Sequence, residues 1–331
     1  MRRLSIIFLT CILILNLFSC KKNEYPKNKT KQIIMRLAET HPKDYPTTRA
    51  NQKFADLVEI RTNGRIKIEV FHSSQLGQER EVIEQVQFGG IDFSRVSCSP
   101  ITNISPLFNA LQFPYVFTDS EHQWKVLNSE IGDKLFESLE EHDLIGLCWY
   151  DSGARNFYNS VKEISKPEDL RGMKIRVQQS DMMVDMLTSL GAIATPMGYQ
   201  DVSAGLQTGF IEGAENNWPS YESTKHYKFA KYYTLDEHSR VPEIMIASKL
   251  VMKKLSLHDQ QIIKQAAKDT MQYQIKEWEK EEKKAEQIVR AQGCIITKVT
   301  DKKLFQKAME PIFEKQTTET QKLIRQIQNK K

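Results

Sequence analysis

The hydrophobic and polar positions of the chain first show one nearly unbroken apolar segment at the N-terminus. Residues 4–18 are apolar apart from a few short polar side chains, follow the basic pair Arg2-Arg3, and end at Ser19. A stretch this short, with basic residues before it and a small residue at its end, is typical of a secretory signal peptide rather than a membrane span. We therefore predict that residues 1–19 are removed on export.

The residue after the predicted cleavage point is a cysteine. Cys20 follows a small residue, as in a lipobox, where the thiol is diacylated and becomes the new N-terminus. Simple secretory cleavage near Ser19 and an uncleaved anchor are the alternatives. Residues 21–31 are almost entirely polar and predict a solvated tether. We expect residues 20–32 to hold the protein on a membrane without crossing it.

Beyond residue 32, strand-like alternation and helix-like periodicity follow one another along the chain. Strand patterns occupy residues 33–38, 66–70, 91–96, 144–150 and 173–177. Helical patterns occupy residues 47–62, 79–88, 120–142, about 257–289 and 301–328. This order predicts an α/β fold in which helices flank open sheets. Because about 300 residues exceed the usual size of one hydrophobic core, we expect two lobes.

Composition and motifs favour binding over catalysis. The formal net charge is +5, or +3 without Arg2 and Arg3, which is too small and too evenly mixed to suggest a nucleic-acid partner. The chain has no P-loop, no nucleotide-binding glycine fingerprint, no HExxH and no Gly-x-Ser-x-Gly, and its histidines lack metal-ligand spacing. We therefore expect neither a cofactor nor a metal ion.

Three cysteines remain beyond the tether. Their number is odd and no two of them form a CxxC motif, so we expect buried thiols at Cys98, Cys148 and Cys294. A Cys98–Cys148 disulfide is the alternative, because an exported protein meets an oxidising compartment.

Three arginines lie near the ends of predicted strands, where open α/β sheets bind their ligands. Arg176 lies on the face of its strand opposite three apolar residues, whereas Arg155 and Arg95 lie at the ends of two other strands. A guanidinium near a lobe interface can hold a carboxylate through two parallel hydrogen bonds. A surface or structural role is the alternative for Arg176. Residues 216–219, Asn-Asn-Trp-Pro, add amides beside an aromatic ring, a combination that suits sugars.

Six short segments occur in the order of one known family, and together they resemble the periplasmic binding proteins of tripartite ATP-independent (TRAP) transporters. Each segment is weak evidence alone, but the ordered set is specific. They are Gly-Arg-Ile-Lys-Ile-Glu-Val at 64–70, Ser-Gln-Leu-Gly-Gln-Glu-Arg at 74–80, Leu-Arg-Gly-Met-Lys-Ile-Arg-Val at 170–177, Thr-Pro-Met at 195–197, Leu-Gln-Thr-Gly at 206–209 and Glu-Gly-Ala-Glu-Asn at 212–216.

The resemblance implies a periplasmic binding protein fold of two α/β lobes, joined by hinge strands and crossed by one long helix. It places residues 33–152 and about 240–280 in the first lobe. The second lobe then contains residues 153–239 and about 281–331.

The resemblance also implies roles for single residues. Arg176 corresponds to the arginine that clamps the ligand carboxylate, Arg155 to a second arginine, and Asn216 to the asparagine after Glu-Gly-Ala-Glu. Glu79 matches an acidic position that contacts the ligand, and Tyr199 a position that often places an aromatic ring near it.

A finer resemblance concerns residues 39–48 and 216–223, which are similar to members that bind hexuronates. His41, Arg95 and Glu237 would then recognise hydroxyl groups. A loop histidine stacked on the next proline is the alternative for His41, and a structural salt bridge is the alternative for Glu237.

Trp218 would add an aromatic face to the same site. Its alternative is a core position at the lobe interface, because buried tryptophan is common.

Together these features predict a periplasmic receptor, not an enzyme, which binds a sugar acid such as D-glucuronate or D-galacturonate and delivers it to the TRAP membrane permease. Sialic acid or a C4-dicarboxylate is the alternative ligand. One alternative function is an exported enzyme that acts on uronates, in which Glu79, His41 and the arginines provide a base and a carboxylate stabiliser. Another alternative is a sensor input domain or a structural lipoprotein.

Overall fold

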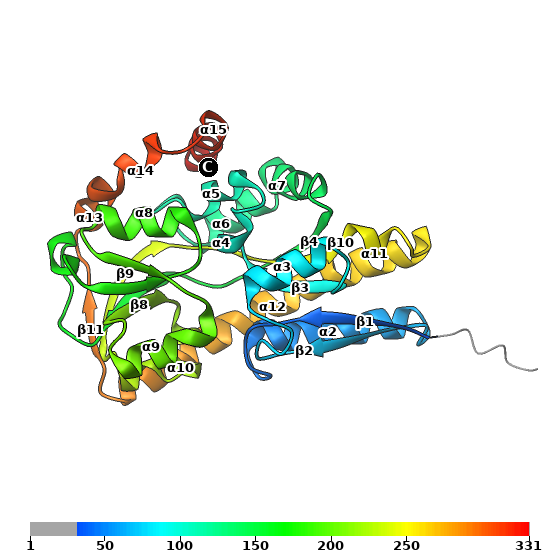
Figure 1. Cartoon of the computed structure of the whole chain (residues 1–331), viewed down its shortest axis with the longest axis horizontal. Helices are drawn as coiled ribbons and strands as arrows, with labels where there is room; N and C mark the ends of the chain where they lie inside the picture. Colours follow the sequence, from blue (N-terminus) through cyan, green and yellow to red (C-terminus); the bar gives the residue numbers. More distant parts are fainter. Residues whose placement is uncertain (1–31, 331) are drawn as a thin grey trace, which may run out of the picture. The chain divides into compact units, whose positions relative to one another are not determined.

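Two sheets, each covered by helices, make up residues 32–330, which are the residues that this computed structural model describes (Figure 1). The α/β prediction is confirmed, and the two sheets form the two expected lobes. The predicted signal peptide, the lipidated Cys20 and nearly all of the tether lie outside the described residues.

The first sheet has five strands in the order β2-β1-β3-β10-β4. β1 is parallel to both β2 and β3, whereas β10 runs antiparallel to β3 and β4. The start of β10 therefore lies at the same edge as the end of β3. The strands are β1 (Ile33–Ala38), β2 (Ile66–Phe71), β3 (Phe93–Ser97), β4 (Leu144–Tyr150) and β10 (Glu243–Ser248).

The second sheet has six strands in the order β11-β9-β5-β8-β6-β7. β6 is parallel to β7 and β8, so the carboxyl ends of these three strands meet at one edge, and antiparallel β5 begins there. The strands are β5 (Arg155–Asn159), β6 (Lys174–Val177), β7 (Ile193–Pro196), β8 (Gly213–Asn216), β9 (Tyr232–Ser239) and β11 (Ile295–Lys298).

Helices cover the sheets and follow the predicted periodicity in most places. The longer ones are α2 (Pro46–Arg61), α3 (Glu79–Gln87), α6 (Ser120–Leu127), α7 (Glu130–Glu140), α8 (Asp181–Ser189), α9 (Val202–Thr208), α10 (Trp218–Ser223), α12 (Leu257–Ala291), α13 (Lys302–Met309) and α15 (Thr318–Asn329). The short ones are α4 (Cys98–Ile101), η1 (Pro106–Phe108), α5 (Asn109–Gln112), η2 (Pro167–Leu170), η3 (Tyr199–Asp201), η4 (His226–Lys228), α11 (Lys249–Met252) and α14 (Pro311–Glu314).

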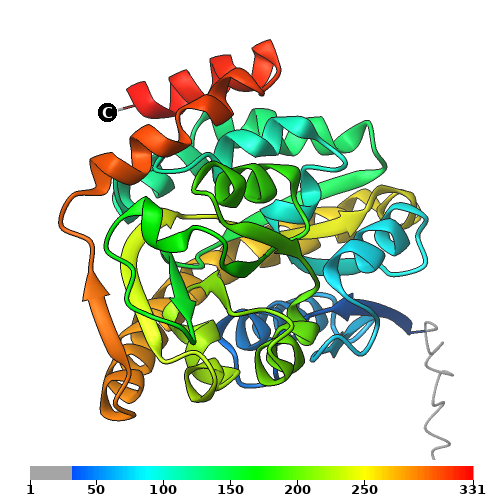
Figure 2. The ribbon, with the colours of Figure 1, turned by 60° about the vertical axis from the view of Figure 1, so that its left-hand side comes forward.

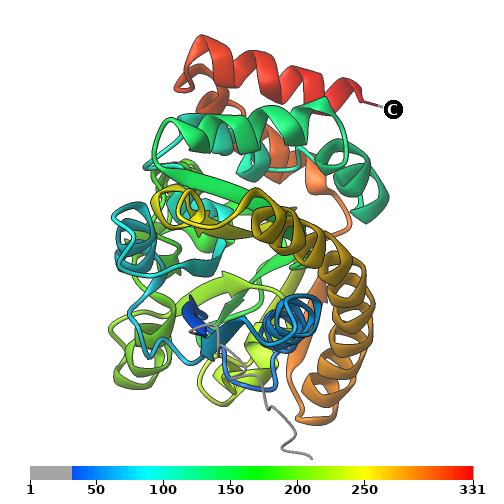
Figure 3. The same ribbon diagram turned by 90° about the vertical axis from the view of Figure 1, so that its right-hand side faces the viewer.

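The long helix α12 connects the two lobes, as predicted (Figure 3). It has 35 residues, and the Ser256 side chain caps it by accepting from the Asp259 amide at 3.1 Å. Its first part packs on α2 and β4 of the first lobe, and a later part packs on α10 of the second. One rigid element therefore contacts both lobes.

Two predicted helices are in fact broken, and both breaks have local causes. Residues 120–142 form α6 and α7, because the Ser129 side chain accepts from the Ile131 amide at 3.3 Å and starts a new helix. Residues 301–328 form three helices: Pro311 lacks the amide hydrogen that would continue α13, and the Thr317 side chain accepts from the Thr320 amide at 3.2 Å and starts α15 after α14. Figure 2 shows these last helices lying across one end of the molecule, where α15 contacts α5 and η1.

Residues 32–330 can be inspected for free cysteines, for membrane-spanning helices and for groups of metal ligands. Cys98, Cys148 and Cys294 are free thiols; the first two are buried and the third is half-buried. No helix in this range is long and apolar enough to cross a membrane. The same residues contain no cluster of histidine, cysteine or carboxylate side chains suited to a metal ion.

The chain passes from the first sheet to the second between β4 and β5, and back between β9 and β10. Gly153, in the first crossing, has φ +61°, and a Cβ there would lie 2.3 Å from Glu282 Oε1 of α12. The crossing therefore favours glycine for its backbone conformation, and a larger residue would also displace the Glu282 side chain.

Glu282 is a half-buried carboxylate beside this crossing. Burial raises its pKa to about 7, and neighbouring Asp151, Glu237 and Glu286 add to the effect, while Arg240 opposes it. The ordinary value is 4.5, so the folded protein holds a proton here that the unfolded chain releases between pH 4.5 and 7. The proton-linked stability is therefore complete below pH 4.5 and is lost as the pH rises through about 7.

We predict that Glu282→Gln removes the loss of stability that the wild type shows as the pH rises through about 7. The full pKa shift corresponds to about 3 kcal/mol, so the variant should gain stability over the wild type at pH 8 and little at pH 5. Urea unfolding at both pH values measures this difference. Glu279→Gln, at an exposed position of the same helix, is the control. A gain of equal size at both pH values would contradict the prediction.

Candidate ligand-binding site

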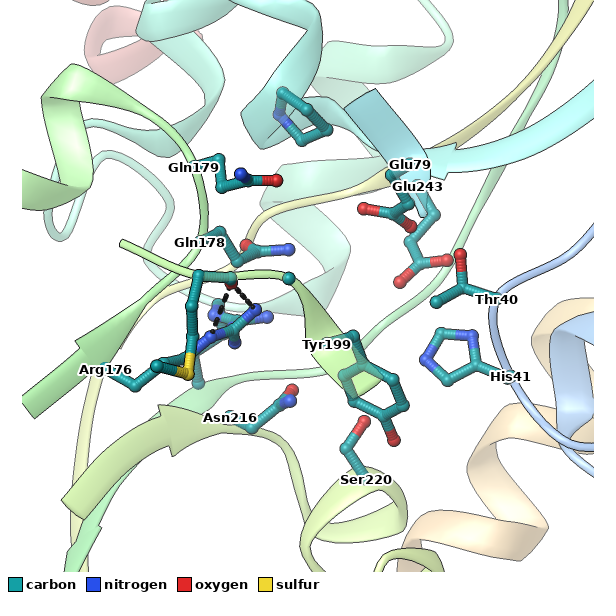
Figure 4. A pocket seen from close by; sticks show the side chains of 14 residues that line it. Thr40, His41, Glu79, Arg176, Gln178, Gln179, Tyr199, Asn216, Ser220 and Glu243 are labelled. Carbon is teal, nitrogen blue, oxygen red and sulfur yellow. Dashed lines mark hydrogen bonds between the residues drawn. The ribbon is translucent and has the colours of Figure 1, made fainter. Parts of the chain in front are cut away.

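A polar cavity lies where the strand edges of the two lobes face each other (Figure 4). The first lobe contributes residues that follow β1, begin α3 and α4, and start β10. The second contributes residues from the start of β5, from the ends of β6, β7 and β8, and from η3 and α10. The lining residues are Thr40, His41, Glu79, Pro100, Arg155, Arg176, Gln178, Gln179, Met197, Gly198, Tyr199, Asn216, Ser220 and Glu243.

Arg176 is the central residue of the second-lobe wall. Its strand β6 is flanked by β7 and β8, and its side chain is only 3 % exposed. Nε and Nη2 donate to the Met197 carbonyl at 3.0 and 2.8 Å, as Figure 4 shows. Among residues 32–330 no carboxylate pairs with this guanidinium. Burial lowers the pKa of Arg176, and the positive charge of Arg155 adds to this effect, while the negative charge of Glu215 opposes it.

Arg155 lines the same wall but already has a counter-ion. Its Nη2 donates to Glu215 Oε1 at 2.9 Å and its Nε donates to Oε2 of the same carboxylate. His238 lies 3.6 Å from Glu215 and 2.8 Å from Asp236. Arg155 is therefore one member of a buried network of two cations and two carboxylates.

This network fixes the charges behind the wall. Burial alone would raise the pKa of Glu215, but Arg155 and His238 overcome this effect and hold it at about 2. Burial would lower the pKa of His238, but Asp236 and Glu215 raise it to about 9. Glu215 and His238 are therefore ionised at neutral pH, and Glu215 is the counter-ion of Arg155, which leaves Arg176 as the guanidinium of this wall without a paired carboxylate among residues 32–330.

Asn216 ends β8 beside the arginines. It is 5 % exposed, and its Oδ1 accepts from the Asn217 amide at 2.9 Å. Within residues 32–330 no acceptor takes its Nδ2 hydrogens, so this amide can donate to a guest in the cavity.

The opposite wall is built around Arg95, which is fully buried on β3 behind the cavity lining. Its Nε donates to Glu39 at 3.0 Å, and its Nη1 donates to Glu79 at 2.8 Å and also to Glu243. One guanidinium thus holds three carboxylates, and His41 Nδ1 lies 2.8 Å from its Nη2.

Glu39 is the structural partner of Arg95. The Asn51 amide and the Thr47 hydroxyl also donate to it, at 2.8 and 3.1 Å. Burial alone would raise the pKa of Glu39, but Arg95 and His41 hold it at about 2. Its negative charge therefore offsets the positive charge of Arg95.

Glu79 and Glu243 line the cavity beyond that pair. Oε1 of Glu79 accepts hydrogen bonds from Arg95 and from the Ser97 amide, and Oε2 of Glu243 accepts one from Arg95. The other oxygen of each carboxylate accepts nothing from residues 32–330. Burial and the charges of Glu79 and Glu39 raise the pKa of Glu243, against the lowering effect of Arg95 and His41. This wall therefore offers hydrogen-bond acceptors to a guest.

His41 and Tyr199 form an aromatic side of the cavity. The His41 ring stacks on Tyr45 with centroids 3.9 Å apart, and Tyr199 meets His41 edge-on at 4.9 Å. The stacking partner of His41 is thus Tyr45 and not the adjacent proline.

Of the nine residues proposed from the sequence, the structure brings six to the cavity lining and three elsewhere. Arg95 lies behind the wall, where its donors serve protein carboxylates. Trp218 is 6 % exposed and stacks on Tyr233 at 4.0 Å, so it occupies a core position. Glu237 pairs with Lys302 at 2.5 Å and has a side chain 48 % exposed, so it forms a surface salt bridge. The residues in the lining are Arg176, Arg155, Asn216, Glu79, His41 and Tyr199.

Sequence reasoning missed Glu243 and the buried Glu39. Glu243 starts a strand that was not predicted, and it reaches the cavity because β10 runs antiparallel between β3 and β4. Its only local signal is a charged residue next to the apolar run Ile244–Ala247.

Several hydrogen bonds join the two lobes around the cavity. Tyr45 donates to or accepts from Ser220 at 2.8 Å, and the Gln200 side chain donates to the Thr40 carbonyl at 2.8 Å. The Gln78 side chain donates to Asp201 at 2.9 Å. These contacts hold the lobes together over the cavity, as in a closed binding protein.

A two-lobed α/β fold with a polar cavity between its lobes defines the class of solute-binding proteins. The profile of the family described as bacterial extracellular solute-binding protein, family 7, matches residues 37–320. The chain therefore belongs to this family. A curated solute-binding protein of Chromohalobacter salexigens is 38 % identical over 292 residues, 87 % of each chain.

Solved structures resemble the whole described fold. A TRAP periplasmic solute-binding protein from Xanthobacter autotrophicus Py2 with bound β-D-galacturonate is 41 % identical, with a TM-score of 0.86 over 89 % of this chain and 99 % of that one. Another, from Chromohalobacter salexigens with bound D-glucuronate, is 37 % identical, with a TM-score of 0.88 over 90 % of this chain and all of that one.

We predict that Glu215→Gln destabilises the protein and reduces its sensitivity to acid. Because the pKa of Glu215 is lowered from 4.5 to about 2, its stabilising effect is present above pH 4.5 and is lost as the pH falls through about 2. The variant leaves Arg155 unpaired, so the free energy of unfolding at pH 7 should fall by about 3 kcal/mol or more. Its further loss between pH 5 and pH 3 should be smaller than in the wild type.

Urea unfolding across this pH range is the measurement. Glu168→Gln removes an exposed carboxylate from the second lobe and serves as the control. Equal acid sensitivity of Glu215→Gln and the wild type would refute the ionised network.

Proposed function

We propose that this protein is the extracytoplasmic receptor of a TRAP-type transporter and binds a hexuronate, of the D-glucuronate or D-galacturonate type. The observation that carries the proposal is the buried guanidinium of Arg176, which lines the interlobe cavity without a counter-ion among residues 32–330. A buried charge without a partner is costly, so the site favours an anionic guest. The structures with bound uronates at 41 and 37 % identity support the choice of ligand.

In the proposed complex the ligand carboxylate lies against Arg176. The guanidinium donates charge-assisted hydrogen bonds to it, and the Asn216 amide adds a neutral donor. Arg155 contributes its positive field while Glu215 fixes its position. Hydroxyl groups at the other end of the sugar donate to the unused oxygens of Glu79 and Glu243.

Lobe closure supplies the affinity. Hydrogen bonds to charged groups strengthen when water is excluded, and the cross-lobe contacts complete the enclosure. Micromolar binding requires about 8 kcal/mol, a total that one arginine–carboxylate pair and several hydroxyl hydrogen bonds can reach. The bound sugar contacts both lobes and so shifts the population toward the closed form, which the membrane permease recognises.

The remaining predictions from the sequence belong to the same proposal. Residues 1–19 direct export, and acylation of Cys20 anchors the protein at the periplasmic membrane surface. The lobes divide near residues 152 and 240, where the chain crosses between the sheets, and α12 leads back to the second sheet before β11. Mass spectrometry of the mature N-terminus distinguishes the acylated cysteine from simple cleavage near Ser19.

We predict that Arg176→Ala abolishes hexuronate binding. Without the guanidinium the ligand carboxylate would be buried with no fixed charge partner, and affinity should fall by at least about 100-fold. Arg176→Lys should recover only part of it, because an ammonium cannot form two parallel hydrogen bonds. Isothermal titration with D-glucuronate and D-galacturonate measures both variants.

Arg171→Ala is the matched control, since it removes an exposed arginine just before the same strand. Circular dichroism checks that each variant is folded. If folded Arg176→Ala kept most of the wild-type affinity, Arg176 would not be the carboxylate clamp. Conversion of the sugar during incubation, detected by mass spectrometry, would favour an enzyme instead of a receptor.

We also predict that Tyr45→Phe weakens binding without changing the ligand preference. The substitution removes the cross-lobe hydrogen bond to Ser220 but keeps the ring that stacks on His41. One such bond contributes about 1 kcal/mol, so affinity for every bound sugar acid should fall by about fivefold. Titration of the same two uronates tests this, and a change in their affinity ratio would assign Tyr45 a direct ligand contact.

A further inference from the structure

The two walls of the cavity differ in charge. The second-lobe wall presents Arg176 as a cation without a counter-ion among residues 32–330, whereas the first-lobe wall presents two carboxylates, Glu79 and Glu243. Figure 4 shows these carboxylates across the cavity from Arg176. A guest that spans the cavity therefore meets a positive charge at one end and acidic groups at the other.

The acidic wall is a built arrangement. Arg95 is fully buried and holds Glu39, Glu79 and Glu243 at once. One positive charge is shared among three carboxyl groups, and the fourth ionisable neighbour, His41, lies on the same side. Because Arg95 already donates to these carboxylates, it has little capacity to neutralise another anion that enters the cavity.

We propose that this wall makes the site selective for acids with a single negative charge and excludes dicarboxylates of the same length. The inference rests on the proposed function, in which the ligand carboxylate lies against Arg176. A second carboxylate at the far end would then face Glu79 and Glu243, and the described residues that line this wall include no lysine or arginine. Like charges brought together in a water-poor site repel strongly.

A hydroxyl group at the far end meets the opposite situation. It donates its hydrogen to the unused oxygen of Glu79 or Glu243, and the acceptor is already oriented by Arg95. The same side chains that reject an anion therefore hold a sugar hydroxyl. Arg95 is a positioning residue in this scheme, since it acts on the ligand through the carboxylates that it holds.

A pair of open-chain sugar acids isolates the effect of charge. Galactonate and galactarate have the same six-carbon skeleton, but galactonate ends in a hydroxymethyl group where galactarate has a second carboxylate. Isothermal titration, or competition against D-galacturonate where binding is weak, gives the affinity ratio of the two acids. We expect the wild type to bind galactonate at least about 100-fold more tightly than galactarate.

The double variant Glu79→Gln/Glu243→Gln tests whether the charges of these two carboxylates cause the preference for galactonate. Glutamine keeps the shape of each side chain and an oxygen that accepts from Arg95, but it removes the charge. The affinity ratio should narrow by at least about tenfold. If the double variant is unfolded by circular dichroism, Glu79→Gln alone should narrow the ratio in the same direction.

Glu84→Gln is the matched control, because it removes an exposed carboxylate from α3, the helix that begins at Glu79. The control should leave the ratio unchanged. The proposal is overturned if the wild-type affinities for the two acids differ by less than tenfold. It is also overturned if the folded double variant keeps the wild-type affinity ratio, or if that variant shows no galactarate binding at millimolar concentration. A control variant that narrows the affinity ratio as much as the double variant would overturn it as well.

These outcomes are separate from failure of the proposed function. A wild type that binds no hexuronate contradicts the receptor proposal. A wild type that binds hexuronates and galactarate equally well keeps that proposal and contradicts only the charge selection.

Discussion

The site depends on the guanidinium of Arg176, which has no carboxylate partner among residues 32–330. Elsewhere the buried arginines of this cavity have protein counter-ions: Arg155 has Glu215, and Arg95 has three carboxylates. Arg176 donates to one carbonyl and is 3 % exposed, so the fold tolerates a buried positive charge that burial itself disfavours. An apolar side chain here would cost less stability, and the charge is therefore best explained by a guest anion. The stability that the protein gives up at this position becomes binding energy when a carboxylate arrives.

The topology explains why residues so distant in sequence meet around that charge. Parallel β6, β7 and β8 bring their carboxyl ends to one edge, and antiparallel β5 begins at the same edge. In the first sheet, antiparallel β10 starts where β3 ends. Each lobe therefore presents loops and strand ends, whose backbone groups are free to bind, toward the other lobe. The long helix α12 contacts both lobes, and Gly153 of the first crossing lies beside it.

The sequence predicted most of the fold, because strong periodicity reflects burial that the chain itself encodes. Strand β6 with Arg176, and the long helix α12, were placed within two residues of their observed bounds. The breaks at Ser129 and Pro311 were missed because apolar spacing continues across them. The site was harder, since Arg95 looks the same in sequence as Arg176. What separates them is tertiary: the carboxylates around Arg95 lie 56, 16 and 148 residues away. No local pattern near Arg95 shows that its donors are already in use, and none near Glu237 shows that it points to Lys302 at the surface.

The distribution of charge between the lobes also constrains what closure can achieve. If both walls carried positive charge, the empty lobes would repel, and any anion could bridge them. With a cation on one side and acidic groups on the other, the two walls attract each other. In the proposed complex the anion of the guest has to satisfy Arg176 while its hydroxyl groups satisfy Glu79 and Glu243. A ligand that satisfies only one wall leaves desolvated polar groups at the other, and the resulting penalty is what makes the site specific rather than merely attractive to anions.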